Sequence, residues 1–130
     1  MTGVQTCALP ISASGFYEWE AIGRVRKPWL FRWRDEQPFG FAGVWESWRA
    51  PTGETRETCA IVTIEPNALL RRIHDRMPVM LTPEQFEPWL DPAVTDPAQL
   101  APLLRAPPAE AMSEFAVSPF VSNVRHEGPE

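Results

Sequence analysis

A chain of 130 residues has room for one small domain or for part of one. Hydrophobic residues make up 44% of the sequence and charged residues 22%, which allows a packed core and argues against general disorder. No apolar run approaches the roughly 18 residues that a membrane-spanning helix needs, and two cysteines make no disulfide framework. We therefore expect a cytoplasmic protein that does not contact a membrane.

Charge is distributed unevenly along the chain. The net charge of −5 by itself argues against a nucleic-acid partner. However, residues 1–76 contain ten Lys and Arg against nine Asp and Glu, whereas residues 77–130 contain two against eight. A local basic groove is therefore compatible with the first part, although composition alone does not predict one.

The first half of the chain predicts a series of β-hairpins. Aromatic-rich segments that roughly alternate in polarity predict strands at residues 14–20, 28–34 and 39–49. Residues 56–64 contain the run CAIV, which is typical of a buried strand. Turn-forming residues separate these segments, so we expect a mainly antiparallel sheet or small barrel.

A helix is expected next, followed by an extended segment at residues 77–81. Pro66 can begin this helix because the N–H groups of the first turn have no partner within the helix, so the N–H that proline lacks is not needed there. His74 follows Leu70 by four residues, so we expect its side chain to point inward with the apolar face. The helix must end before Pro78, which disfavours helical geometry in the preceding residue.

The last part of the chain predicts a second helix and a final strand. Thr82 and Pro83 form a good helix start, with the threonine as cap and the proline in the first turn. Residues 97–104 predict another short helix, and residues 115–124 return to strand character.

Glu18 is the first candidate for chemistry. It lies between Tyr17 and Trp19, and bulky apolar neighbours can raise the pKa of a carboxyl and suit it to proton transfer. The alternative is an outward-facing glutamate on an alternating strand, which the spacing alone favours.

His74, followed by Asp75 and Arg76, forms a second polar cluster. A histidine at a helix end can act as an acid–base group near neutral pH, although a structural histidine with satisfied hydrogen bonds is the more common outcome. Arg76 can hold a phosphate through its planar guanidinium group or pair with Asp75. The residues leave both interpretations open.

Aromatic and arginine residues also alternate in the first half of the chain. Such a pattern suits a surface on which bases stack and guanidinium groups meet phosphates, but core packing with solvated charges explains it equally well. The residues concerned are Tyr17, Trp19, Trp33, Trp45 and Trp48, with Arg32, Arg34 and Arg49. The spacing of cysteines and histidines does not match a zinc site, and we expect no metal and no other cofactor.

Three stretches together resemble the SOS response-associated peptidase (SRAP) family of abasic-site processing proteins. They are ASGFYEWE, TCAIVTIEPNALLRRIHDRMPVML and VSPFVSNV, in that order, and the resemblance runs from about Ser12 to the C-terminus. It implies an α+β fold, a mainly antiparallel open β-barrel with flanking helices. It also implies a monomer that acts at the nucleoid in the SOS response to DNA damage, on single-stranded DNA containing abasic sites.

The resemblance further implies a covalent chemistry. In this family the protein removes its initiator Met, and the exposed N-terminal cysteine forms a thiazolidine crosslink with the aldehyde of the ring-opened sugar. Glu18 matches the glutamate that positions the cysteine amine and moves protons, and His74 matches the histidine that assists ring opening and Schiff-base formation. Arg76 matches a phosphate contact, and Trp19 matches an aromatic that wedges against bases. The implied enzyme class is a peptidase or hydrolase with lyase-like Schiff-base chemistry.

The opening of the chain departs from the family pattern. The family begins Met-Cys-Gly-Arg and has many residues before its GFYEW motif, which this chain reaches at residue 15. Residues 1–11 show no strand periodicity and match one translated frame of a common sequencing-adapter oligonucleotide. We therefore predict a non-native segment at residues 1–11 and a truncated SRAP domain at residues 12–130 whose N-terminal strands are missing.

A truncated domain of this kind has consequences for both activity and stability, and it leaves other functions open. Cys7 would be accidental and no substitute for the family nucleophile, so we expect no crosslinking activity. Unpaired sheet edges would make the fragment prone to aggregation. The alternative function is a noncovalent single-stranded DNA-binding module that uses Arg76, Trp19 and other arginines, and a generic small barrel with another ligand is a third.

Overall fold

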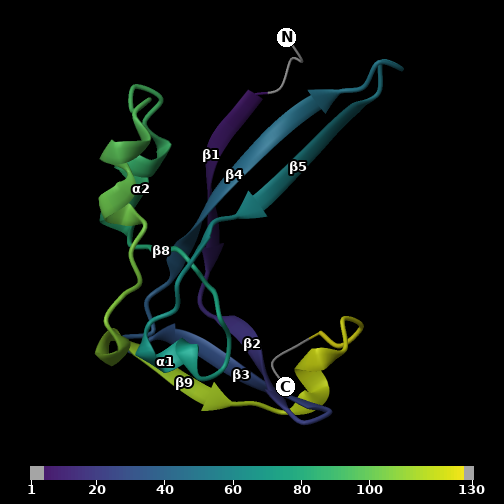
Figure 1. The fold of residues 1–130 in the computed structure, drawn as a ribbon, viewed down its shortest axis with the longest axis vertical. Coiled ribbons are helices and arrows are strands. Elements are labelled where there is room, and N and C mark those ends of the chain that lie inside the picture. Colours follow the sequence, from purple (N-terminus) through teal and green to yellow (C-terminus); the bar gives the residue numbers. More distant parts are fainter. Residues whose placement is uncertain (1–4, 128–130) are drawn as a thin grey trace. The chain divides into compact units, whose positions relative to one another are not determined.

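The computed structural model describes residues 5–127, with side chains from Cys7 onward. The first four residues of the adapter-like opening and the last three of the expected domain lie outside the described residues. The chain divides into two compact units, whose elements are labelled in Figure 1. Unit 1 comprises Met1–Ala13, Phe39–Ile64 and Pro78–Ala106, and unit 2 comprises Ser14–Pro38, Glu65–Met77 and Pro107–Glu130.

Unit 1 is built on an antiparallel sheet with the strand order β1-β4-β5 (Figure 1). Its strands are β1 (Gln5–Ala13), β4 (Phe39–Arg49) and β5 (Thr55–Ile61), with β8 (Met80–Leu81) also paired to β4. The short strand β6 (Thr63–Ile64) follows β5. The strand predicted at residues 39–49 is therefore confirmed.

The opening of the chain is a strand, contrary to its lack of periodicity. β1 pairs with β4 along its whole length, from Gln5 opposite Ser47 to Ala13 opposite Phe39. Backbone hydrogen bonds to a long neighbouring strand do not require strict alternation of polarity in the added strand. A periodicity test on the sequence alone misses a strand of this kind.

β5 corrects the prediction of a buried strand at residues 56–64. All seven of its residues are exposed, including the apolar Cys59, Ala60 and Ile61. β5 pairs with β4 along one edge, while the helix of unit 1 lies mainly against β1, β4 and β8. An apolar run is buried only where another element covers it, and the sequence does not show that element.

The helix predicted at Thr82 is α2 (Pro83–Leu90). The Gln85 side chain accepts a hydrogen bond from the Thr82 N–H at 3.0 Å, which completes the first turn. Trp89 is buried, and its indole Nε1 donates to the carbonyl of Gly43 at 3.2 Å. The core of unit 1 gathers around this side chain and contains Ala42, Val79, Leu81 and Trp89.

Residues 97–104 form two 3₁₀ turns instead of one helix. They are η1 (Pro97–Gln99) and η2 (Ala101–Leu103). Pro102 lacks the N–H that a continuous helix would need, so the chain turns twice without propagating an α-helix.

Unit 2 contains the antiparallel sheet β2-β3-β9 (Figure 1). Its strands are β2 (Phe16–Ile22), β3 (Val25–Trp33) and β9 (Met112–Ala116). β2 and β3 form the expected hairpin, joined by Gly23 and Arg24, and Gly23 has a φ of +61°. A two-residue loop with glycine first is a favoured hairpin connection, and it sets the register that places Glu18 opposite Trp29.

The helix expected from Pro66 to residue 77 is much shorter than predicted. α1 covers only Ala68–Arg71, and Asn67 caps it by accepting a hydrogen bond from the Leu70 N–H at 3.1 Å. The asparagine, whose side chain can reach the N–H groups of the first turn, starts the helix in place of Pro66. The chain then leaves helical geometry before His74 and continues to β7 (Met77–Pro78).

The strand expected at residues 115–124 is also wrong in extent. β9 begins at Met112 and ends at Ala116, preceded by the 3₁₀ turn η3 (Ala109–Ala111). Residues Pro119–Ser122 form another 3₁₀ turn, η4, because Ser118 caps it by accepting from the Phe120 N–H at 3.2 Å. The Ser-Pro pair therefore starts a turn at the point where apolar content alone suggested a strand.

The core of unit 2 lies on one face of its sheet. Phe31, Leu70, Met77 and Met112 are buried, and the rings of Phe16 and Phe31 stack with centroids 5.5 Å apart. Together the two units give the α+β class that the sequence predicts, with mostly antiparallel strands in open sheets and few helices.

Candidate active site

Glu18 lies in the middle of β2 on the covered face of the unit 2 sheet. Successive residues of a strand point to opposite faces, so Tyr17 and Trp19 lie on the other face. Trp29 stands directly across from Glu18 on β3 and shares its face. The Glu18 side chain is only 22% exposed, so the interpretation of a fully outward-facing glutamate is wrong.

His74 lies beyond the end of α1, held by a carbonyl group of that helix. Its N–H donates to the carbonyl of Leu70 at 2.9 Å. Because α1 has already ended, the imidazole does not point into the core as predicted, and its side chain is 41% exposed. It instead faces β2, with Nε2 3.8 Å from Oε2 of Glu18.

The second ring nitrogen of His74 is engaged by the residues that follow it. Nδ1 accepts a hydrogen bond from the Arg76 N–H at 3.1 Å, and it lies 3.0 Å from the Arg76 carbonyl and 3.4 Å from Oδ1 of Asp75. When Nδ1 accepts, the neutral ring carries its proton on Nε2, on the side of Glu18. When the ring is protonated, Nδ1–H can donate to the Arg76 carbonyl. Both protonation states of His74 therefore have hydrogen-bond partners.

Burial raises the pKa of the Glu18 carboxyl above its ordinary value. A charged His74 and a hydrogen bond with the backbone of Trp19 lower the pKa, and the charge of Asp75 raises it, but burial is the largest cause. A partly buried carboxyl beside an imidazole is an arrangement suited to proton transfer.

A hollow of about 580 Å³ lies beside His74 in unit 2. His74 and Asp75 form part of its wall, together with Glu65, Pro66, Arg71, Arg72 and Ile73. It is large enough for a sugar and its phosphate groups, and it brings the imidazole of His74 and two guanidinium groups to a common surface.

Trp19 and Arg76 are the other two residues predicted for the site. Trp19 lies on the opposite face from Glu18, and its indole Nε1 donates to Oγ of Ser122 at 2.9 Å. Arg76 is exposed, and its backbone N–H and carbonyl hold His74. The structure therefore joins Glu18, His74 and the backbone of Arg76, while Trp19 presents its ring on the other side of the sheet.

Two further residues beside the site were not predicted from the sequence. Trp29 faces Glu18 across the hairpin, and the guanidinium group of Arg72 lies over its ring at 5.0 Å. Arg72 also pairs with Glu114 of β9. Gly23 marks a two-residue hairpin turn in the sequence, and the register set by that turn could have predicted Trp29 opposite Glu18. No local sequence pattern indicates the position of Arg72.

Within residues 5–127, no group of three or more His, Cys, Asp or Glu side chains is placed to hold a metal ion. In the same part of the chain, no helix has the length and apolar character needed to cross a membrane.

Comparison with known proteins shows the family and supports the fold. The family model for the SOS response associated peptidase (SRAP) matches residues 3–124. The abasic site processing protein YoqW of Bacillus subtilis is 39% identical over 125 residues, which cover 95% of this chain and 55% of YoqW. YedK of Escherichia coli, also an abasic site processing protein, is 31% identical over 120 residues, which cover 91% of this chain and 53% of YedK.

A solved structure agrees with these matches. A crystal structure of a protein from Bacteroides thetaiotaomicron has a TM-score of 0.79 and 31% sequence identity, covering 90% of this chain and 52% of that one. The chain thus spans about half the length of the relatives it matches.

The open, mostly antiparallel sheets and few helices define an SRAP-like α+β protein. The chain belongs to the SOS response associated peptidase family. The family match begins within the adapter-like opening, and so reaches further toward the N-terminus than the resemblance that begins at Ser12.

Proposed function

We propose that this chain is the part of an abasic site processing protein that binds single-stranded DNA at the lesion and moves protons for the chemistry there. The observation that carries the proposal is the approach of His74 Nε2 to Glu18 Oε2, at 3.8 Å. The two residues are 56 positions apart in the sequence, and each belongs to a motif that resembles the family. A common role in proton transfer explains this approach of the two side chains better than a chance ion pair between two such motifs does.

The proposed reaction joins an N-terminal cysteine to the ring-opened sugar. The amine loses a proton and adds to the C1′ aldehyde, the resulting hydroxyl group takes up a proton and leaves as water, and the thiol adds to the C=N carbon. An aminothiol and an aldehyde thus give a thiazolidine and one water. Glu18 and His74 would exchange the protons of the first two steps, because their side chains lie 3.8 Å apart and one is a carboxyl group and the other an imidazole.

Trp19 and Arg76 complete the proposed site. Arg76 would hold a phosphate beside the lesion, and the ring of Trp19 would stack against a base. In the whole protein we propose that the same Glu18–His74 pair assists the removal of the initiator Met, which exposes the cysteine, and that the protein acts on DNA at the nucleoid.

Neither cysteine of this chain can supply the nucleophile. Cys7 lies within β1 and Cys59 within β5, so the nitrogen of each is part of a peptide bond. A thiazolidine needs a free amine and a thiol on the same residue. We therefore propose that the 130-residue chain does not form the crosslink by itself.

Noncovalent binding of single-stranded DNA is the second candidate function. Nine of the twelve Lys and Arg residues of the chain fall in unit 2, which contains the Glu18–His74 pair. These nine are Arg24, Arg26, Lys27, Arg32, Arg34, Arg71, Arg72, Arg76 and Arg125. Unit 2 also contains ten Asp and Glu and is therefore nearly neutral, whereas unit 1 contains seven Asp and Glu against three Arg. This difference favours unit 2 as the part that contacts phosphates, even where no covalent step follows.

The experiment that tests the proposal supplies the nucleophile from outside. Cysteine methyl ester, a small aminothiol, is mixed with a single-stranded oligonucleotide that carries one abasic site, with and without the chain. We expect the chain to accelerate formation of the thiazolidine, measured by mass spectrometry. Binding without acceleration would favour the noncovalent module, and the absence of both would refute the proposed function.

A further inference from the structure

The tip of the β2–β3 hairpin carries three cations within four residues. The turn residues Gly23 and Arg24 are followed by Arg26 and Lys27, in the sequence GRVRK. All of them are exposed. The positive φ of Gly23 makes a tight turn, which keeps this charge at the very end of the hairpin.

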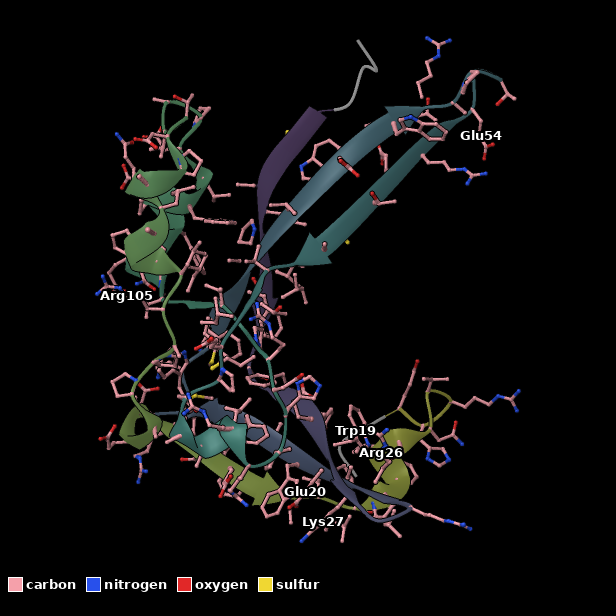
Figure 2. All side chains as sticks on the ribbon, in the orientation of Figure 1. Trp19, Glu20, Arg26, Lys27, Glu54 and Arg105 are labelled. Atoms are coloured by element: carbon pink, nitrogen blue, oxygen red, sulfur yellow. The ribbon has the colours of Figure 1, made fainter. Side chains whose placement is uncertain are left out.

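The register of the hairpin distributes these cations over both faces. Arg26 stands opposite Ala21 and shares a face with Trp19, whereas Lys27 stands opposite Glu20 and shares a face with it. Figure 2 shows Trp19 and Arg26 on one side of the hairpin and Glu20 and Lys27 on the other. Arg26 therefore lies on the same face of the hairpin as Trp19, and Lys27 lies on the same face as Glu18 and Glu20.

On the face that carries Lys27, contacts with Trp29 hold the side chains of the hairpin tip in place. Nζ of Lys27 lies 4.6 Å from the centre of the Trp29 ring, and Glu20 accepts a hydrogen bond from the indole Nε1 of that residue at 2.9 Å. These contacts give Lys27 a defined position and engage the nearest carboxylate. The ring of Trp29 links the tip to Arg72, which lines the hollow beside His74.

The two arginines of the tip form no salt bridge with the carboxylates that the structure describes. Among the described residues, no salt bridge joins Arg24 or Arg26 to a carboxylate. Arg32, by contrast, pairs with Glu36, and Arg56 pairs with Glu54. Arg24 and Arg26 are therefore exposed cations without a salt bridge to any described carboxylate, on the hairpin that also carries Glu18.

We propose that the tip of the β2–β3 hairpin binds the phosphate backbone of the single strand on one side of the abasic site. Arg24 and Arg26 contact phosphates there, and Trp19, on the same face as Arg26, lies beside a base of that flank. Guanidinium groups beside an aromatic ring are the combination by which proteins hold single strands without reading their sequence, and here the ring is that of the half-buried Trp19. This inference rests on the proposed function, because it names the surface that holds the same DNA.

The test compares two double variants with the same loss of charge. In R24Q/R26Q the hairpin tip loses both arginines, and in R56Q/R105Q unit 1 loses two exposed arginines. The probe is a single-stranded oligonucleotide with one tetrahydrofuran residue, a stable abasic analogue, and binding is measured by fluorescence anisotropy at several salt concentrations.

The inference predicts different outcomes for the two variants. R24Q/R26Q should bind about tenfold more weakly, and the slope of log K against log salt should shrink by about 1.4, which corresponds to two lost phosphate contacts. R56Q/R105Q should bind as the unchanged chain does, and R24K/R26K should retain most of the affinity.

Each contrary result has a distinct meaning. Equal binding by R24Q/R26Q and the unchanged chain would overturn the inference and leave the proposed function standing. An equal loss in both glutamine variants would also overturn it, because the effect would then be one of net charge. If the unchanged chain does not bind the probe at all, the proposed function fails as well.

Discussion

Replacing Glu18 by Gln isolates the role of its carboxyl in the proposed chemistry. The amide keeps the size of the side chain and its place opposite Trp29 on the hairpin, but it cannot give or take a proton. In the reaction between cysteine methyl ester and an abasic single strand, we expect E18Q to bind the DNA and to lose most of the acceleration that the chain provides.

The size of the loss can be estimated from the geometry. General acid–base catalysis contributes factors of about 10² to 10⁴, which correspond to about 2.7 to 5.5 kcal/mol of activation free energy. The Glu18–His74 separation of 3.8 Å is longer than a hydrogen bond, and the imidazole is 41% exposed. Both observations favour the lower end of the range, so we expect a loss of about a hundredfold.

The pH dependence provides a second measurement in the same assay. Because burial raises the pKa of Glu18, the carboxyl should ionise at a higher pH than an exposed glutamate does. The acceleration by the unchanged chain should show this ionisation, and the residual rate of E18Q should not.

A matched variant controls for the loss of one negative charge. Glu46 is an exposed residue of β4 in unit 1, and E46Q should accelerate the reaction as well as the unchanged chain does. If E18Q retains the full acceleration, or if E46Q loses as much, the assignment of proton transfer to Glu18 is wrong.

Three further predictions concern stability and the opening of the chain. A raised pKa in the folded state means that Glu18 contributes stability below its unfolded pKa and loses it as the pH rises through the folded pKa. The melting temperature of E18Q should therefore be higher than that of the unchanged chain at neutral pH and equal to it in acid. Trp89→Ala should cost unit 1 about 3 to 5 kcal/mol in chemical denaturation. Trp89→Phe, which loses the hydrogen bond to Gly43 and part of the buried ring, should cost less, about 1 to 3 kcal/mol. Resequencing the source upstream of Ser12 with different adapters should replace residues 1–11 by another open reading frame; the same eleven residues in that library would contradict a non-native origin.

The elements that the sequence predicted well are those that local chemistry specifies. Alternation of aromatic and polar residues predicted the hairpin of β2 and β3 and the long strand β4, because a strand shows its period within a few residues. Thr82 and Pro83 marked the start of α2 for the same reason, since a cap acts within one turn.

The elements that the sequence predicted poorly depend on distant residues or on competing local bonds. The apolar run in β5 resembles a core strand, but its burial depends on which element covers it. Two side-chain hydrogen bonds also changed where elements begin. Asn67 caps the start of α1 in place of Pro66, and Ser118 starts a 3₁₀ turn where a strand was expected.

The sequence by itself determined which residues of this protein are candidates for chemistry. Glu18 and His74 could be chosen because a carboxyl between aromatic residues and a histidine beside an acid and an arginine are recognisable as short motifs. Only the tertiary structure decided that the two side chains meet, because α1 ends early enough for His74 to turn toward β2. It also decided that Trp29 and Arg72 stand beside them, since hairpin register and packing join residues that no local pattern connects.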